Sequence, residues 1–262
     1  VRCFEDDNVA HQEEGVDPVR DKETIDTELQ LKDLETVEKR LEKAQKHNKS
    51  GNKAAEKEVA LFERVKSHLE TGRSVRSMDL SEEELESIRD LQLLTLKPVL
   101  YIANVGEDEV ERGNSAVAQL KESIQEERAP LLTISAKIEA EIAELEEAEE
   151  RQGLLAMYGL SEPGVNRLIH EAYNLLELIT FYTAGKPEVR AWPLRKGSTA
   201  PEAAGVIHSD FQRGFIKAEV ISYQDFVACG SEANAREAGK LRLEGKQYVV
   251  RDGDVIHFKF NV

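Results

Sequence analysis

The residues best suited to chemistry lie in two short polar motifs, each directly after an apolar run. Asn104-Val105-Gly106-Glu107 follows residues 99–103, and Ser135-Ala136-Lys137 follows residues 131–134. An asparagine amide both donates to and accepts from a purine edge, and a carboxylate accepts from ring and amino N–H groups. The second motif could cover the same base with its backbone N–H groups and the aliphatic part of its lysine side chain. The alternative for either motif alone is a plain surface turn.

The elements around these motifs predict how they are positioned. The two apolar runs are predicted strands, and residues 115–127 between them have a helix-forming composition. Strand, helix, strand is typical of a parallel sheet, in which ligands bind beyond the carboxyl ends of the strands. Residues 1–4 predict a further short strand, and residues 138–151 and 165–178 predict two more helices. We therefore expect the two motifs at one edge of an α/β domain.

Residues 24–89 interrupt this pattern with a proline-free, charge-rich stretch. Apolar side chains recur three and four residues apart, first as Leu34, Val37, Leu41 and Ala44 and then as Val59, Phe62, Val65 and Leu69. That spacing is typical of amphipathic helices, and the polar residues 47–53 between the stripes predict an antiparallel, coiled-coil-like hairpin. Gly72 is expected to end the second helix. Ser81 with Glu84 predicts the capping box of a third helix.

Residues 179–262 alternate short β-rich runs with turns. The predicted strands are 179–182, 189–192, 218–221, 248–250 and 255–258. A helix at 201–207, with Thr199 as its cap, completes a mixed sheet around one helix, the β-grasp arrangement. The sequence thus predicts an α/β domain (residues 1–23 and 90–178), an inserted hairpin (residues 24–89) and a C-terminal α+β domain (residues 179–262).

Charge is spread unevenly over the chain, whose formal net charge is −16. Residues 179–262 hold 12 of the 35 Lys and Arg but only 10 of the 51 Asp and Glu. An acidic surface repels polyphosphates, so we expect no specific DNA partner. Cations for RNA phosphates are offered by Arg190, Arg195, Lys196, Arg213 and Lys217, and in the hairpin by Lys39, Arg40, Lys43 and Lys46. A mixed solvated surface is the alternative in both places.

Composition excludes several classes of protein and site. No apolar run approaches the roughly 18 residues that a membrane-spanning helix needs. Cys3 and Cys229 lie far apart without a CxxC partner, so neither a disulfide framework nor a structural zinc site is predicted. No two histidines lie within four residues of each other, which leaves no helical zinc motif. A cytoplasmic location is expected.

Several longer stretches follow the pattern of a known family. They are the opening Val1-Arg2-Cys3-Phe4-Glu5-Asp6-Asp7, the hairpin, residues 104–107, 178–185, 189–192, 204–211, 214–216 and 252–254. Together they resemble the YchF (Obg-like ATPase) family of P-loop NTPases, with its C-terminal TGS domain, a β-grasp module. The resemblance implies a P-loop-type sheet, hydrolysis of ATP or GTP with Mg²⁺, and association with the ribosome or ribosomal RNA in translation or stress regulation. Glu107 matches the family's Glu in place of the usual Asp, which is linked to relaxed guanine preference and use of ATP.

The phosphate-binding half of such a site is absent from this sequence. No G-x-x-x-x-G-K-[ST] motif occurs, because the Gly-Lys pairs at 185, 239 and 245 are followed by Pro, Leu and Gln. Without that loop there is no backbone cradle for phosphates and no hydroxyl for Mg²⁺. The resemblance places the Mg²⁺ ligands upstream of Val1, as part of a longer protein, so no catalytic or metal-binding residue is predicted here. This chain alone is expected to hydrolyse nothing. The alternative function is a non-catalytic RNA- or protein-interaction module.

Overall fold

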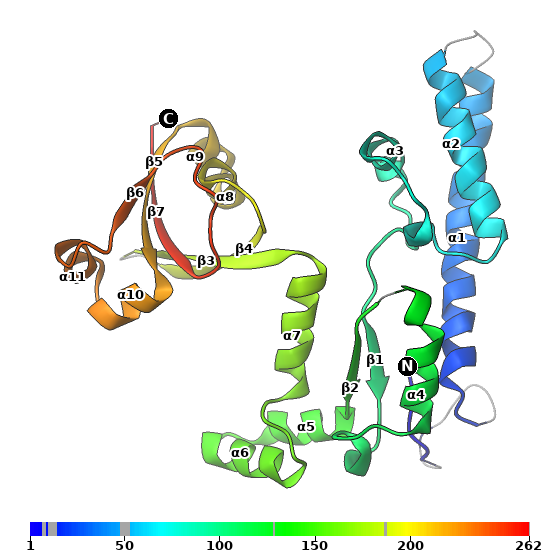
Figure 1. The fold of residues 1–262 in the computed structure, drawn as a ribbon, viewed down its shortest axis with the longest axis horizontal. Coiled ribbons are helices and arrows are strands. Elements are labelled where there is room, and N and C mark those ends of the chain that lie inside the picture. Colours follow the sequence, from blue (N-terminus) through cyan, green and yellow to red (C-terminus); the bar gives the residue numbers. More distant parts are fainter. Residues whose placement is uncertain (7–8, 10–14, 48–52, 128, 186–187, 262) are drawn as a thin grey trace. The chain divides into compact units, whose positions relative to one another are not determined.

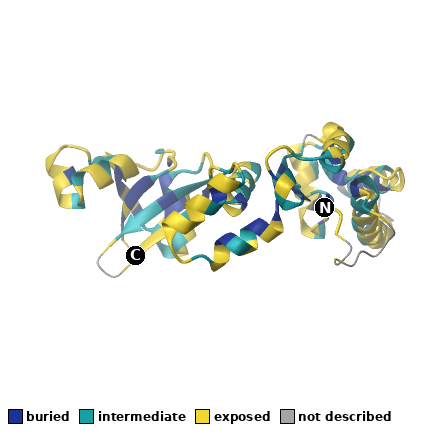
Figure 2. Cartoon of the chain, turned by 90° about the horizontal axis from the view of Figure 1, so that it is seen from below, coloured by how far each residue is buried: buried dark blue, intermediate teal, exposed yellow. Residues whose placement is uncertain are grey.

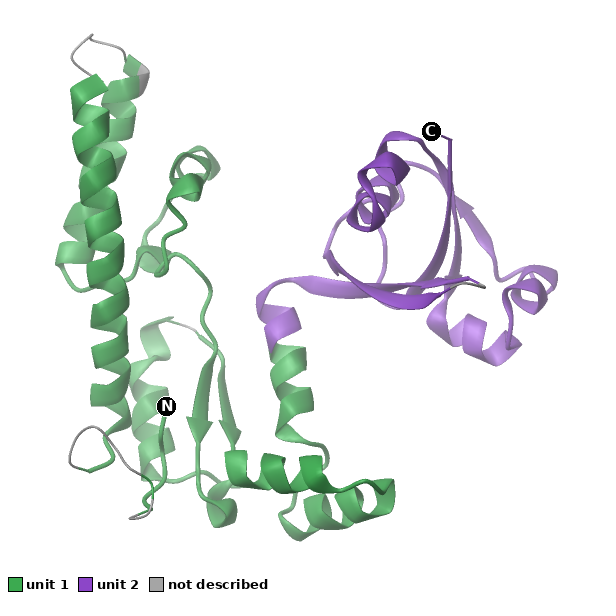
Figure 3. Ribbon diagram, turned by 180° about the vertical axis from the view of Figure 1, so that it is seen from behind, with its two compact units in different colours: residues 1–171 green, residues 172–262 purple. Residues whose placement is uncertain are grey.

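The computed structural model describes residues 1–6, 9, 15–47, 53–127, 129–185 and 188–261. It forms two compact units, unit 1 from Val1 to Glu171 and unit 2 from Ala172 to Val262 (Figure 3). Both units contain helices and strands, so the chain is a mixed α/β protein. Within the predicted hairpin turn at 47–53, residues 48–52 lie outside the described residues, and so do Asp7 and Lys186 from the motifs above.

Two long helices of unit 1, α1 (Pro18–His47) and α2 (Lys53–Glu70), pack side by side (Figure 1). Their predicted apolar stripes form one cluster, in which Val37, Phe62 and Val65 have no exposed surface. The opposite sides of both helices are largely exposed (Figure 2). Helix α1 begins before the predicted boundary at residue 24, because Asp17 Oδ1 accepts from the N–H groups of Val19 and Arg20 at 3.1 and 3.0 Å.

The helix end and the helix cap predicted for the segment after α2 are both present. Gly72 has a φ of +74°, a conformation open to glycine that ends the helix. Helix α3 (Glu82–Ile88) begins with the predicted capping box, in which Ser81 Oγ accepts from Glu84 N and Glu84 Oε2 accepts from Ser81 N. The hairpin, α3 and the short 3₁₀ turns at Val75–Ser77 and Arg89–Leu91 share one apolar cluster.

A small parallel sheet forms the other part of unit 1. Strand β1 (Tyr101–Asn104) pairs with β2 (Leu131–Ile134), and α4 (Ser115–Ser123) lies between them in the sequence. The predicted strand at residues 1–4 is reduced to a single parallel bridge between Arg2 and Asn104. The backbone of Val1 and Cys3 still bonds to Asn104, and Arg2 Nε donates to Phe4 O at 3.0 Å.

Three helices follow β2, namely α5 (Ala136–Glu144), α6 (Ala148–Met157) and α7 (Gly164–Leu175). The prediction of one helix over residues 138–151 is therefore wrong. The break at residues 145–147 is stabilised by Arg151, whose Nε donates to Leu145 O at 2.8 Å. A continuous helix would also crowd the glutamates of this stretch onto neighbouring turns, where like charges repel.

Unit 2 is built on a mixed five-stranded sheet in the order β4-β3-β7-β5-β6. The strands are β3 (Leu178–Ala184), β4 (Val189–Arg195), β5 (Phe215–Ser222), β6 (Arg242–Glu244) and β7 (Asp254–Phe260). Among the described strands of this sheet, β3 and β7 pair in parallel and the other pairs are antiparallel. Helix α8 (Ala200–Ile207), with the predicted cap at Thr199, packs on one face around Phe181, Leu194 and Phe258.

The shorter elements of unit 2 differ from the sequence prediction. Residues 248–250 do not form a strand, because only Val249 bridges, to Thr199. Strand β6 and the helices α9 (Ser209–Arg213), α10 (Tyr223–Cys229) and α11 (Glu232–Glu237) are not predicted. They contain eight residues or fewer, too few for an apolar period to stand out. Within the described residues of both units, no helix is long and apolar enough to cross a membrane.

Candidate functional site

The two polar motifs meet at one edge of the small sheet. Asn104, the last residue of β1, pairs with Ile134, the last residue of β2. Val105 N donates to Ile134 O at 2.9 Å, which extends the ladder one step beyond the strands. Residues 105–107 and 135–137 therefore leave the sheet at the same edge, the carboxyl edge at which parallel sheets bind ligands.

The amide of Asn104 is held in one orientation. Its Oδ1 accepts from Ala136 N at 2.9 Å, which identifies that atom as the oxygen, because a backbone N–H cannot face the NH₂ group. Its own backbone is fixed by Val1 O, 2.9 Å from Asn104 N, and by Cys3 N, 2.7 Å from Asn104 O. Among the residues that the structure describes, Nδ2 of Asn104 has no acceptor. Its two N–H groups are suited to the acceptor atoms of a purine, such as N7.

Glu107 and Lys137 form an ion pair across the edge. Glu107 Oε1 lies 2.8 Å from Lys137 Nζ, and the hydrogen bond with Glu107 raises the pKa of the Lys137 ammonium. The lysine side chain is 68% exposed, so the pair is screened by water and contributes little to stability. A ligand can therefore separate the two groups at low cost and use each of them.

Two of the remaining predicted site residues are buried, whereas Ala136 is exposed. Val105 is buried in the apolar cluster of the sheet, and Ser135 is buried as well. Ser135 Oγ has no hydrogen-bond partner within the described part of the chain. The N–H of Ala136 is already donated to Asn104. The second motif thus positions the Asn104 amide through its backbone rather than offering free donors of its own.

Two residues that sequence reasoning missed hold the first motif in place. Glu109 Oε2 accepts from Gly106 N at 3.3 Å and from Asn114 Nδ2 at 2.8 Å. Asn114 Nδ2 also donates to Cys3 O at 2.7 Å, and its Oδ1 caps α4 by accepting from Val117 N at 3.0 Å. The only signal in the sequence is an Asn directly before a predicted helix, which indicates a cap but not a link to the motif.

Two further polar side chains follow β2 in the sequence. Glu139 of α5 accepts from Gly164 N at 2.7 Å and from Val165 N at 3.1 Å, which fixes the start of α7. Burial raises the pKa of the Tyr158 phenol, as do the nearby carboxylates of Glu107 and Glu141. Tyr158 therefore lies within the electrostatic reach of the Glu107–Lys137 pair, although no sequence motif marks it.

Within the described residues, one group has the geometry of metal ligands, and it lies in unit 2. One ligand atom each from Glu219, Glu232 and His257 lies within 4.8 Å of the others. Arg236 already contacts both carboxylates at 3.2 Å, and Lys259 lies 3.5 Å from Glu219. These cations neutralise the carboxylates, so the group does not suit Mg²⁺. At the sheet edge the Glu107 carboxylate is likewise paired, with Lys137.

Comparison with known proteins places the chain in a family. The profile of the C-terminal YchF-GTPase family, described as "Protein of unknown function (DUF933)", matches residues 178–261. The ribosome-binding ATPase YchF of Bacillus subtilis (strain 168) is 51% identical over 264 residues, covering 100% of this chain and 72% of the relative. The chain belongs to the YchF family. The YchF ATPase of Escherichia coli O157:H7 is 49% identical, again over 100% of this chain and 72% of the relative.

A solved YchF structure has the same fold. The Schizosaccharomyces pombe YchF GTPase superposes with a TM-score of 0.85 at 38% identity, covering 99% of this chain and 70% of that one. The resemblance read from the sequence motifs is thus confirmed. The five-stranded mixed sheet of unit 2 is consistent with the TGS domain expected for a YchF protein.

Proposed function

We propose that this YchF-family chain is a ribosome-associated, nucleotide-binding protein of the ATPase or GTPase type that acts in translation or stress regulation in the cytoplasm. Its bacterial relatives carry the name "Ribosome-binding ATPase YchF". The observation that carries the nucleotide part is the Asn104 amide, whose Oδ1 accepts from Ala136 N at 2.9 Å while its N–H groups have no acceptor among the described residues. The relatives' names support the ribosomal part.

The two units take different roles in this proposal. The sheet of β1 and β2 is part of a P-loop-type nucleotide-binding domain, and the helical hairpin projects from it as a partner-binding surface. Residues 179–262 are a TGS domain of the β-grasp type, supported by the strand order β4-β3-β7-β5-β6 and by α8 on one face.

Both ATP and GTP fit the chemistry of the edge. The N–H groups of Asn104 suit N7, which adenine and guanine share. The Glu107 carboxylate accepts from the amino group of adenine or from the N–H groups of guanine, and Lys137 supplies a donor beside it. When bound with the nucleotide, Mg²⁺ neutralises charge on the phosphates. The residues of this chain bind and orient the base.

Replacing Asn104 with Ala is expected to weaken nucleotide binding by about 1–3 kcal/mol, or roughly 5- to 150-fold in Kd, because the donors to the base are lost. The affinity is measured by titrating the isotope-labelled chain with ATP and with GTP. The amide NMR shifts of Gly106 and Ala136 report the binding. The matched control is Asn166→Ala, since Asn166 is an exposed asparagine of α7 in the same unit. Equal affinities of Asn104→Ala and the unsubstituted chain would remove Asn104 from the site.

The 262-residue chain is expected to show no magnesium-dependent ATP turnover above background, because its sequence has no phosphate-binding loop. A phosphate-release assay with ATP and Mg²⁺ tests this, with the Asn104→Ala variant as the control for a contaminating enzyme. Turnover that is lost in Asn104→Ala would contradict the expectation and assign catalytic groups to this chain.

The alternative is a non-catalytic RNA- or protein-interaction module. In that case the sheet edge is a scaffold and the NMR titration gives no saturable shifts with either nucleotide. Ribosome co-sedimentation of the chain then measures the partner-binding part independently of nucleotide.

A further inference from the structure

Three side chains of unit 2 that come from different elements converge beside the sheet. Glu219 lies on β5 and His257 lies on β7, and the two residues are partners in the antiparallel ladder of these strands. Glu232 is the first residue of α11. One carboxylate oxygen of each glutamate and one ring nitrogen of His257 lie within 4.8 Å of one another. The sheet therefore fixes the backbone of two of the three groups.

The same three side chains line a small hollow whose other walls are apolar. Its volume is about 10 Å³, which is room for one water molecule or one metal ion. The other six lining residues are Ala184, Ile221, Phe226, Leu241, Val255 and Ile256. Glu219 is only 8% exposed, and a carboxylate that is buried in this way needs a paired cation or a metal.

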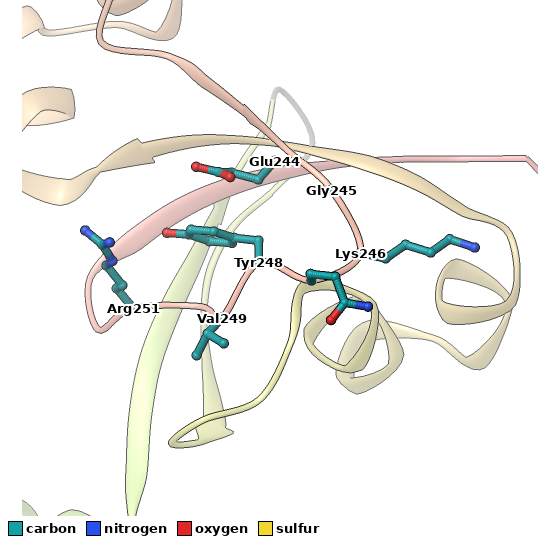
Figure 4. Close-up of a pocket in the computed structure, with 7 residues that line it drawn as sticks. Glu244, Gly245, Lys246, Tyr248, Val249 and Arg251 are labelled. Atoms are coloured by element: carbon teal, nitrogen blue, oxygen red, sulfur yellow. The ribbon is translucent and has the colours of Figure 1, made fainter.

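A larger hollow of unit 2 lacks such a set of ligands. Its volume is about 600 Å³, and it is lined by residues 244–249 and Arg251 (Figure 4). Among these lining residues Glu244 is the one carboxylate and none is a histidine, while Lys246 and Arg251 add positive charge. Glu244 is moreover paired with Arg242 at 3.3 Å. Since these cations repel a metal ion, the small hollow is the better metal site.

The protein already places a cation against both carboxylates of the small hollow. Arg236 Nη2 lies 3.2 Å from Glu219 Oε2 and 3.2 Å from Glu232 Oε1. Lys259 Nζ is more distant, at 3.5 Å from Glu219 Oε2 and 3.5 Å from His257 Nε2. The side chains of Arg236 and Lys259 are 54% and 41% exposed, so both can turn into water. A metal ion that binds here replaces Arg236.

The ligand atoms decide which metal can replace the guanidinium. Mg²⁺ prefers oxygen ligands and keeps several of its own waters, so it gains nothing from the imidazole of His257. Zn²⁺ bonds to imidazole nitrogen and to carboxylate oxygen, and it accepts three protein ligands with a water as the fourth. Ligand atoms around a tetrahedral Zn²⁺ ion lie about 3.4 Å apart, so each side chain needs to move by roughly 1 Å.

We propose that Glu219, Glu232 and His257 form a Zn²⁺ site in which the metal takes the position of the Arg236 guanidinium. The imidazole and the two carboxylates supply three ligands, and a water supplies the fourth. Bound Zn²⁺ ties the start of α11 to β5 and β7, so it stabilises the folded form of unit 2. Neither a nucleotide nor a ribosome takes part in this site.

Isothermal titration calorimetry of the 262-residue chain with Zn²⁺ measures the affinity, with about 5 mM Mg²⁺ present to occupy weak acidic sites. We expect His257→Ala and Glu232→Gln each to weaken Zn²⁺ binding at least about tenfold, because each removes a ligand. The matched controls are His170→Ala and Glu237→Gln, which replace exposed residues outside the hollow, the second of them on the same helix as Glu232. Both controls are expected to stay within about twofold of the unsubstituted chain.

Arg236→Ala is expected to bind Zn²⁺ about fivefold more tightly, because the metal then displaces no cation. A purely structural role of these residues predicts no such gain. The fluorescence of Trp192 gives a second readout, since this tryptophan lies in unit 2. We expect about 100 µM Zn²⁺ to raise the melting temperature of unit 2 by about 5 °C and to leave that of His257→Ala unchanged.

Three outcomes overturn the proposal. The first is a titration in which the unsubstituted chain takes up no Zn²⁺. The second is an equal loss of affinity in the ligand variants and in their controls, which assigns the metal to scattered surface groups. The third is an affinity of Arg236→Ala that equals or falls below that of the unsubstituted chain, because the metal then does not take the place of the guanidinium.

Discussion

The Asp33→Ala variant is expected to destabilise unit 1 by about 3 kcal/mol, because it leaves three donors without an acceptor. Asp33 lies on α1 and is only 2% exposed. Its Oδ1 accepts from Leu94 N at 2.8 Å, and its Oδ2 accepts from Thr95 N and Thr95 Oγ1, both at 2.7 Å. Thr95 Oγ1 in turn accepts from Val75 N at 3.1 Å. One carboxylate thus ties the hairpin to the chain that leads into β1.

Thermal unfolding followed by circular dichroism at the helical band measures this, and we expect the melting temperature to fall by about 6–12 °C. Glu35→Ala is the matched control on the same helix. Lys39 and Lys32 hydrogen-bond to Glu35 and lower its pKa to about 2, but the side chain is 48% exposed. Because water screens these pairs, Glu35→Ala is expected to have the same melting temperature as the unsubstituted protein. Similar losses in the two variants would mean that Asp33 is not the anchor.

Asp33 also shows what the sequence cannot predict. The apolar stripes, the end of α2 at Gly72 and the capping box at Ser81 are encoded within a few residues, and they are confirmed. Asp33 stands in a charge-rich helix and has the pattern of a solvated residue. Its donors lie 61 and 62 residues further along the chain, so only the fold identifies it as buried. The same reason applies to Asn114, whose bond to Cys3 O spans 111 residues.

The candidate site is predictable in its residue types and not in its hydrogen bonds. Two motifs after two strands suffice to place Asn104 and Ala136 at one edge. The sequence prediction that the N–H groups of the second motif cover a base did not foresee that Ala136 N donates to Asn104. It also did not foresee the Glu107–Lys137 pair, because that contact depends on how α5 leaves β2.

Basic residues show the same limit on sequence reasoning. Arg190 and Arg213 were candidates for RNA contact, but each is paired with a nearby carboxylate. In the hairpin, Lys39 pairs with Glu35, and Arg40 lies near Glu58 and Asp90. Arg195 and Lys196 are not paired within the described residues, and the fold places beside them a second basic segment, 246–251, that the sequence prediction did not include. Charge counts along the chain therefore do not identify which cations are available.

The Gly214→Ala variant is expected to destabilise unit 2 by about 3 kcal/mol through a purely steric effect. Gly214 has a φ of −88°, which alanine adopts without strain. A Cβ there would overlap the carbonyl oxygen of Asn261 and lie 2.8 Å from its carbonyl carbon. Asn261 N donates to Gly214 O at 2.9 Å, so the two backbones cannot separate without losing the contact that holds the end of β7 beside the start of β5.

Gly205→Ala is the matched control, because the three atoms nearest to its Cβ would all belong to the side chain of Gln212, with Oε1 at 2.5 Å. Gln212 has other rotamers, and replacing a glycine inside α8 with alanine favours the helix by about 1 kcal/mol. Trp192 is the single tryptophan and lies in unit 2, so its fluorescence reports the unfolding of that unit alone. We expect Gly214→Ala to lower the melting temperature by about 10 °C or more and Gly205→Ala to leave it unchanged or raise it. If both variants melt alike, the backbone at Asn261 moves freely, and the end of β7 is not fixed by this contact.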